Sequence, residues 1–79
     1  ASLPVSREAN RYQPGDLVTW NLNPQGWLPH IGVVIDRMSP DGKRRLIVHN
    51  MGGGTVAEDI LFRFPITGHY RFIPGVTKR

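Results

Sequence analysis

The 79-residue chain contains no cysteine. Disulfide bonds and a thiolate zinc site, which often support folds of this size, are therefore excluded within these residues, and so is a thiol nucleophile. A chain this short buries only about 60% of the surface that it exposes when unfolded, so its core is small. We expect a partner or a further segment to contribute to its stability.

Long apolar runs and acidic residues are also scarce. No run approaches the roughly 20 residues of a membrane-spanning helix, and we expect no membrane span. Ten Lys and Arg residues outnumber six Asp and Glu residues, which gives a formal net charge of +4. Much of the basic charge lies at a predicted turn (43–45) and at the end of the chain. We interpret it as solvated surface charge, and we do not expect nucleic acid to be the partner.

Turn-forming residues are abundant, and they separate short β-strand patterns. Nine glycines and seven prolines punctuate segments rich in β-branched and aromatic residues at 16–21, 29–36, 44–50 and 68–73. Segment 55–64 reads either as a short strand or as an irregular crossing, with Glu58 and Asp59 outside. We predict a mainly β class, a small antiparallel sheet curling into a partly open barrel. Residues 1–11 are predicted to form an extended connector and residues 12–79 a single β-rich unit.

The second and third predicted strands should form a hairpin. The sequence SPDG at 39–42 fits a type I turn, with Pro at its second position and Gly at its fourth. If the turn is centred between positions 40 and 41, residues whose numbers sum to 81 lie opposite each other. His49 then faces Gly32, and His30 lies diagonally across from His49 on the same face, with Cα atoms roughly 7–8 Å apart. A register slip of one residue would destroy this arrangement.

The same alternation assigns the two faces of the hairpin. Five aliphatic residues fall on the face opposite the histidines, and we predict that this face is the core: Ile31, Val33, Ile35, Leu46 and Val48. The histidine face also carries Val34 and Ile47, which makes it too apolar for water. We therefore expect a segment outside these residues, a helix, to cover it.

His30 and His49 are the candidate catalytic residues. A nucleophile needs an imidazole to take its proton, and that imidazole needs a second polar group to fix its tautomer. His69 has no evident companion on its face and is predicted to be structural, as is Asp16 at the entry to its strand. Glycine inside a strand leaves room for an approaching ligand. Tryptophan side chains can line a binding site, although core packing is their commoner role. The candidate substrate-binding residues are Trp20, Trp27, Gly32 and Asn50.

Several sequence runs, in order, resemble known bacterial families. The runs PGDLVTW, PHIGVVID and LIVHN resemble the papain-like cell-wall peptidases of the NlpC group. The runs VTWNL, LPHIG, IVHNMG and ITGHYR are closer still to a bacterial domain of unknown function allied to that group. The likeness extends over residues 12–72, and several motifs in order are more specific than any single one.

The resemblance implies the β half of a papain-like α+β fold. In that group a cysteine at the start of a helix is the nucleophile, so His30 would be the base and His49 the residue that orients it. The absence of cysteine departs from the pattern and implies that the nucleophile lies in a missing N-terminal helical half. The implied substrate is a peptide or amide bond of peptidoglycan in the cell envelope, in the periplasm or outside the cell. Neither a cofactor nor a metal is implied.

Two other readings remain open. A small basic barrel with exposed aromatic residues could instead be a non-catalytic module that binds a peptide, a glycan or a nucleic acid. Alternatively, both histidines and a carboxylate could bind zinc. Asp36 shares their face, but it lies about six residues from His30, roughly 20 Å along a strand, so the third ligand would have to come from elsewhere.

Overall fold

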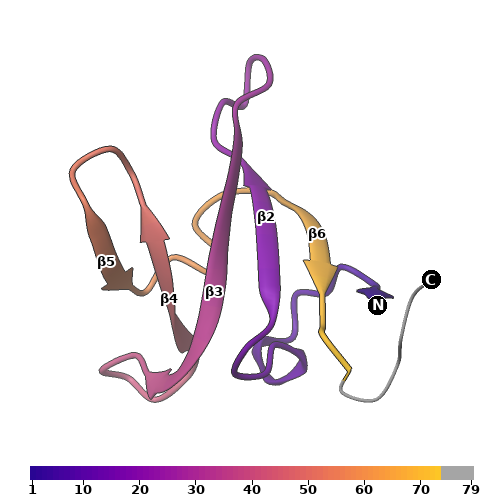
Figure 1. Ribbon diagram of the computed structural model, residues 1–79, viewed down its shortest axis with the longest axis vertical. Helices are drawn as coiled ribbons and strands as arrows, with labels where there is room; N and C mark the ends of the chain where they lie inside the picture. The colour runs from indigo at the N-terminus through magenta and orange to yellow at the C-terminus, as the bar shows by residue number, and fades with distance from the viewer. Residues whose placement is uncertain (74–79) are drawn as a thin grey trace.

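The computed structural model, which describes residues 1–73, consists of one antiparallel sheet (Figure 1). Its order is β1-β6-β2-β3-β4-β5, so β1 and β5 form the two edges. This open antiparallel sheet confirms the predicted mainly β class. The elements are β1 (Ser2–Leu3), the 3-10 helix η1 (Ala9–Arg11), β2 (Leu17–Asn21), β3 (Pro29–Met38), β4 (Arg45–Asn50), β5 (Thr55–Glu58) and β6 (Ile66–Tyr70).

The predicted hairpin forms between β3 and β4, and residues 32–34 pair with residues 47–49 in the predicted register. Gly32 pairs with His49 and Val34 with Ile47, and the register shifts only between Val34 and Met38. The turn closes through the Gly42 backbone N–H, which donates to the Ser39 carbonyl at 2.8 Å. Gly42 has a φ of 71°, a conformation that other residues rarely adopt. Next to the turn Met38 pairs with Arg45, so an irregularity between Val34 and Met38 separates the register at the turn from the register at the histidines.

The predicted core face is wrong. The buried face is the one that carries the histidines, where Val34 and Ile47 are 1% and 0% exposed, whereas Ile31 on the other face is 55% exposed. Both faces of the hairpin are apolar, so alternation alone could not tell which one is covered. The core residues are Tyr12, Val18, Trp20, Val34, Ile47, Ile60 and Leu61.

The chain itself covers the histidine face, where the sequence led us to expect an outside helix. Figure 1 shows the segment between β5 and β6 crossing behind β4 and β3. Ile60 and Leu61 of this segment are buried, and the Leu61 carbonyl accepts a hydrogen bond from the Trp20 indole N–H at 2.9 Å. Segment 55–64 thus combines both readings of its sequence, a strand at 55–58 followed by an irregular crossing.

The N-terminal segment, predicted as an extended connector, carries two elements. Ser2 and Leu3 pair with Tyr70 and His69 of β6, and η1 follows at 9–11. Tyr12, directly after η1, is 1% exposed, and its hydroxyl donates to the Ser6 carbonyl at 2.6 Å. Within residues 1–73 no helix is long and apolar enough to cross a membrane.

Candidate functional site

Three side chains on adjacent strands form a hydrogen-bonded chain. His30 Nε2 of β3 lies 2.9 Å from His49 Nδ1 of β4, and His49 Nε2 lies 2.8 Å from Glu58 Oε1 of β5. His30 is half-buried, the His49 side chain is 2% exposed and that of Glu58 is 48% exposed. The structure thus brings together the two histidines that the sequence singled out and adds an acidic residue to them.

Sheet pairing explains why these three groups meet. His49 lies opposite Gly32, which places it diagonally from His30, and Glu58 lies opposite Ile47, which places it diagonally from His49. The two imidazole rings meet edge to face, with centroids 5.1 Å apart. The Trp20 ring lies 5.9 Å from that of His30 and forms part of the core beside it. Two of the three groups therefore sit on the inner strands of a hydrogen-bonded ladder.

Glu58 is the functional candidate that the sequence reasoning missed, since it placed this residue only on the outside of segment 55–64. A strand register for 55–58 would have found it, because β4 and β5 pair residues whose numbers sum to 105 across the glycine loop. That register puts Glu58 on the same face as His49. The ambiguity of segment 55–64 hid this signal.

The environment of His30 suits a base. Its pKa lies below the ordinary value of 6.5, first because burial disfavours the charged ring and second because His49 is close by. A neutral imidazole at pH 7 can accept a proton. His30 Nδ1 makes no hydrogen bond to any other atom of residues 1–73, whereas its Nε2 is engaged by His49.

Two of the predicted substrate-binding residues are packing residues. Trp20 is fully buried. A Cβ at Gly32 would lie 2.5 Å from Ile47 Cγ2 and 3.1 Å from the Trp20 ring, so the absence of a side chain at Gly32 makes room for the core. Neither residue presents a surface to a substrate in this structure.

The other two predicted residues are exposed. The Asn50 side chain accepts a hydrogen bond from the Gly52 backbone N–H at 2.7 Å, and so it shapes the loop after β4. Trp27 is 64% exposed and borders a cavity of about 410 Å³. Only Trp27 of the predicted set therefore meets the requirement of an accessible contact surface at a cavity.

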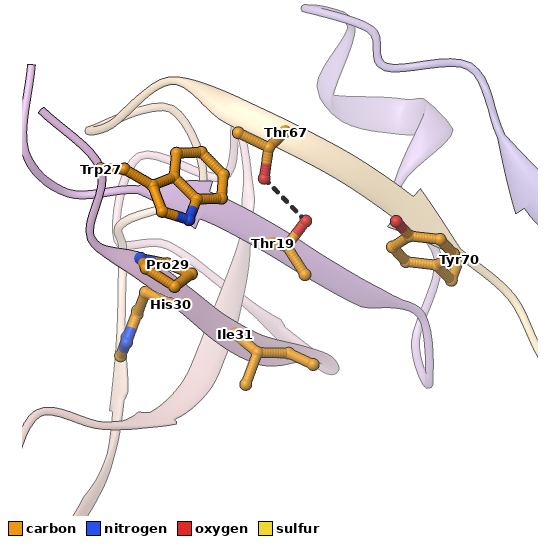
Figure 2. A pocket seen from close by; sticks show the side chains of 7 residues that line it. All are labelled: Thr19, Trp27, Pro29, His30, Ile31, Thr67 and Tyr70. Atoms are coloured by element: carbon orange, nitrogen blue, oxygen red, sulfur yellow. Dashed lines mark hydrogen bonds between the residues drawn. The ribbon is translucent and has the colours of Figure 1, made fainter.

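His30 is also one of the residues that line this cavity. Figure 2 shows the His30 ring directed away from the Trp27 indole, with Thr19 and Thr67 hydrogen-bonded to each other at 2.9 Å. His30 thus belongs both to the lining of the cavity and to the hydrogen-bonded chain with His49. The cavity is lined by Thr19, Trp27, Pro29, His30, Ile31, Thr67 and Tyr70.

A second cluster, formed by Asp16, His69 and Arg71, joins the start of β2 to the end of β6. His69 Nε2 donates to Asp16 Oδ2 at 2.6 Å, and Arg71 donates to both oxygens of the same carboxylate at 2.8 Å. Burial raises the pKa of Asp16, but hydrogen bonds from Arg71, the Gln13 backbone N–H and His69 outweigh it and lower the pKa to about 2. Both Asp16 and His69 are 1% exposed, and the Tyr12 ring stacks on His69 at 4.2 Å. This surrounding agrees with the structural role predicted for both residues.

No group of three or more His, Cys, Asp or Glu side chains among residues 1–73 could hold a metal ion. In the His30–His49–Glu58 chain, the nitrogens and oxygen that would bind a metal are hydrogen-bonded to one another instead.

Comparison with known proteins places the chain in a family. A family model described as a domain of unknown function (DUF1287) matches residues 1–72. The chain belongs to this family. The match confirms the predicted resemblance to a domain of unknown function, whereas the further link to NlpC-type peptidases stays a prediction.

The DUF1287 domain is also similar to a longer curated protein. It is 45% identical over 69 residues to the "Uncharacterized protein YijF" of Escherichia coli (strain K12), an alignment that covers 87% of this chain and 32% of that protein. The chain thus spans about a third of the length of this relative. No solved structure matches this chain.

Proposed function

We propose that the DUF1287 domain is the histidine-bearing part of a papain-like cysteine hydrolase that cleaves peptide or amide bonds of bacterial peptidoglycan in the cell envelope. The observation that carries the proposal is the hydrogen bond between His30 and His49, which leaves the other ring nitrogen of His30 available. The nucleophile would be a cysteine outside these 79 residues, which contain none.

In this mechanism His30 moves one proton at Nδ1. It takes the proton of the thiol, and the resulting thiolate attacks the carbonyl carbon of the scissile bond. The same proton then goes to the leaving nitrogen as the carbon–nitrogen bond breaks, which leaves a thioester. Water hydrolyses the thioester in the reverse sense, first giving a proton to Nδ1, and that proton then returns to the sulfur. Throughout, His30 Nε2–H stays bonded to His49, which holds the ring in place.

The test uses a full-length family member that carries this domain. Wild-type and His30→Ala proteins are compared for hydrolysis of purified peptidoglycan fragments and for alkylation of the cysteine by iodoacetamide at neutral pH. The exposed Arg37, on the same strand, provides a control variant, Arg37→Gln. Loss of hydrolysis and of rapid alkylation in His30→Ala alone supports the proposal. A dispensable His30, or a protein without a reactive cysteine, contradicts it.

A second candidate is ligand binding without catalysis, which the cavity beside Trp27 favours. Its lining holds exposed aromatic and apolar side chains with two threonine hydroxyls, and no Lys or Arg of residues 1–73 takes part in it. Such a lining suits an uncharged peptide or glycan better than a nucleic acid, which needs basic groups. Fluorescence of Trp27, titrated with neutral peptidoglycan fragments, tests this: a saturable change that disappears in Trp27→Phe supports binding, and an unchanged spectrum contradicts it.

A further inference from the structure

The position of each proton in the His30–His49–Glu58 chain follows from its acidic end. An ionised carboxylate only accepts hydrogen bonds, so His49 Nε2–H must donate to Glu58. A neutral His49 then carries no proton on Nδ1, which accepts from His30 Nε2–H. A neutral His30 in this tautomer has its lone pair on Nδ1. The Glu58 carboxylate therefore determines, through His49, which nitrogen of the His30 ring is basic.

The burial of the chain makes this control effective. His49 lies between His30 and Glu58 with its side chain 2% exposed, so water cannot readily replace either partner. Competing tautomers would place two N–H groups or two lone pairs against each other at this buried ring, which is unfavourable. In contrast, the Glu58 side chain is 48% exposed and bears no other hydrogen bond within residues 1–73.

We infer that Glu58 is a positioning residue, which holds His49 and His30 in the tautomers that leave His30 Nδ1 as the proton acceptor. Its catalytic consequence rests on the proposed hydrolase function, but its effect on the tautomers does not. The carboxylate also stabilises the charge that develops when His30 takes a proton, because His30 then donates to His49 and His49 to Glu58. Glu58 touches neither the nucleophile nor the substrate in this scheme.

A carboxylate and an amide should act differently at this position. The glutamine side chain of Glu58→Gln has nearly the same size, but its NH₂ group can donate to His49 Nε2. That bond would move the His49 proton to Nδ1 and the His30 proton to Nδ1 as well, so the lone pair of His30 would face inward. The aspartate of Glu58→Asp keeps the acceptor and should keep the wild-type tautomers, although its shorter chain lengthens the bond.

The experiment reads the tautomers directly in the 79-residue chain. Long-range ¹H–¹⁵N correlation spectra of ¹⁵N-histidine-labelled protein are recorded at about pH 8, where an ordinary histidine is neutral. We expect His30 and His49 protonated on Nε2 in the wild type, the same in Glu58→Asp, and His30 wholly or partly protonated on Nδ1 in Glu58→Gln. Glu8→Gln is the matched control, since Glu8 is a surface acid paired with Arg11 and makes the same change of charge.

Either of two results overturns the inference. One is a wild-type spectrum with His49 or His30 protonated on Nδ1, which needs no variant at all. The other is a Glu58→Gln spectrum identical to that of the wild type. Because Glu58 sits half-exposed at a sheet edge, the spectra of all variants should keep the dispersion of a folded protein.

A kinetic arm in a full-length family member separates this inference from the proposed function. In Ser-His-Asp enzymes, an amide in place of the orienting carboxylate costs about 10⁴ in kcat through the wrong tautomer; with an extra imidazole in between, we expect about a 10²-fold loss of kcat in Glu58→Gln and little change of KM. Wild-type hydrolysis with kcat unaffected by Glu58→Gln would leave the hydrolase standing and refute the role of Glu58. Tautomers that respond to Glu58 in a protein without hydrolase activity would refute the proposed function alone.

Discussion

At the scale of the residue, the protonation of His30 is the property closest to chemistry. Burial, and secondarily His49, lowers its pKa from 6.5. The folded state therefore binds this proton less readily than the unfolded chain does. Lower pH then favours unfolding: the free energy of unfolding falls as the pH drops through about 6.5 and levels off below the folded pKa.

We predict that the ring protons of His30 titrate below 6.5 in a proton NMR titration. Urea unfolding between about pH 8 and pH 5 should show the matching loss of stability, and His30→Asn should reduce that slope because it removes the group. A His30 pKa at or above 6.5 would show that burial does not govern its charge.

Gly32 affects the stability of the protein because the core leaves no room for a side chain at this position. A methyl group in Gly32→Ala would overlap Ile47 and press on the Trp20 ring. We expect Gly32→Ala to lower the free energy of unfolding by about 1–3 kcal/mol, the usual cost of overpacking a core. Ile47→Ala removes the atoms that the new methyl group would overlap. A double-mutant cycle of Gly32→Ala and Ile47→Ala, measured by urea unfolding, should therefore give a favourable coupling free energy. Additive losses would mean that the two sites do not contact each other.

At the scale of the element, the two faces of β3 and β4 differ in what covers them. Ile47→Ala should cost about 2–5 kcal/mol of unfolding free energy, because it empties a fully buried site. Ile31→Thr, on the exposed face, should change it by less than about 0.5 kcal/mol. Thermal unfolding followed by circular dichroism compares the two variants. The reverse order would restore the face assignment that alternation alone suggested.

Strand and turn signals were enough to predict the hairpin and, from it, the meeting of His30 and His49. The pairing of Gly32 with His49 was predicted by counting from the turn, whereas the irregularity between Val34 and Met38, which shifts the pairing next to the turn by two, was not. The covered face was not predictable in the same way, since it depends on where Ile60 and Leu61 pack after an irregular segment. Glu58 was missed because its own strand, β5, begins beyond a loop of three glycines, so its pairing with β4 did not follow from a recognised turn.

At the scale of the whole molecule, the Asp16 carboxylate connects the start of β2 with β6 and with the N-terminal segment. His69 and Arg71 both bond to it, and Arg71 also donates to the Arg11 carbonyl at 3.2 Å. The Ala1 backbone nitrogen in turn donates to the Arg71 carbonyl at 2.7 Å. A buried carboxylate thus joins segments that are more than fifty residues apart in the sequence.

This cluster predicts how acid unfolds the protein. The pKa of Asp16 is about 2 when folded, below its ordinary 3.8, so its contribution is present above about pH 4 and is lost as the pH falls toward 2. We expect about 2 kcal/mol of stability to disappear over this range. Asp16→Asn should abolish that pH dependence and destabilise the protein at neutral pH, since it leaves the buried His69 and the partly exposed Arg71 without their charged acceptor. Chemical unfolding of both proteins from about pH 7 to pH 2 measures these effects, and an equally steep acid transition in Asp16→Asn would contradict them.

The edge position of β5 has a kinetic consequence for the base. All four residues of β5 are exposed, and the loop that leads to it contains Gly52 and Gly54 at φ of 94° and 114°. Edge strands of this kind open and reclose by local unfolding while the rest of a sheet stays intact. Whenever β5 detaches, His49 loses its acceptor, and the proton on the His30 ring is free to exchange between its two nitrogens. The share of time for which β5 stays docked, which amide hydrogen exchange at Val56 and Glu58 reports, thus sets an upper limit on the fraction of molecules that Glu58 holds ready to react.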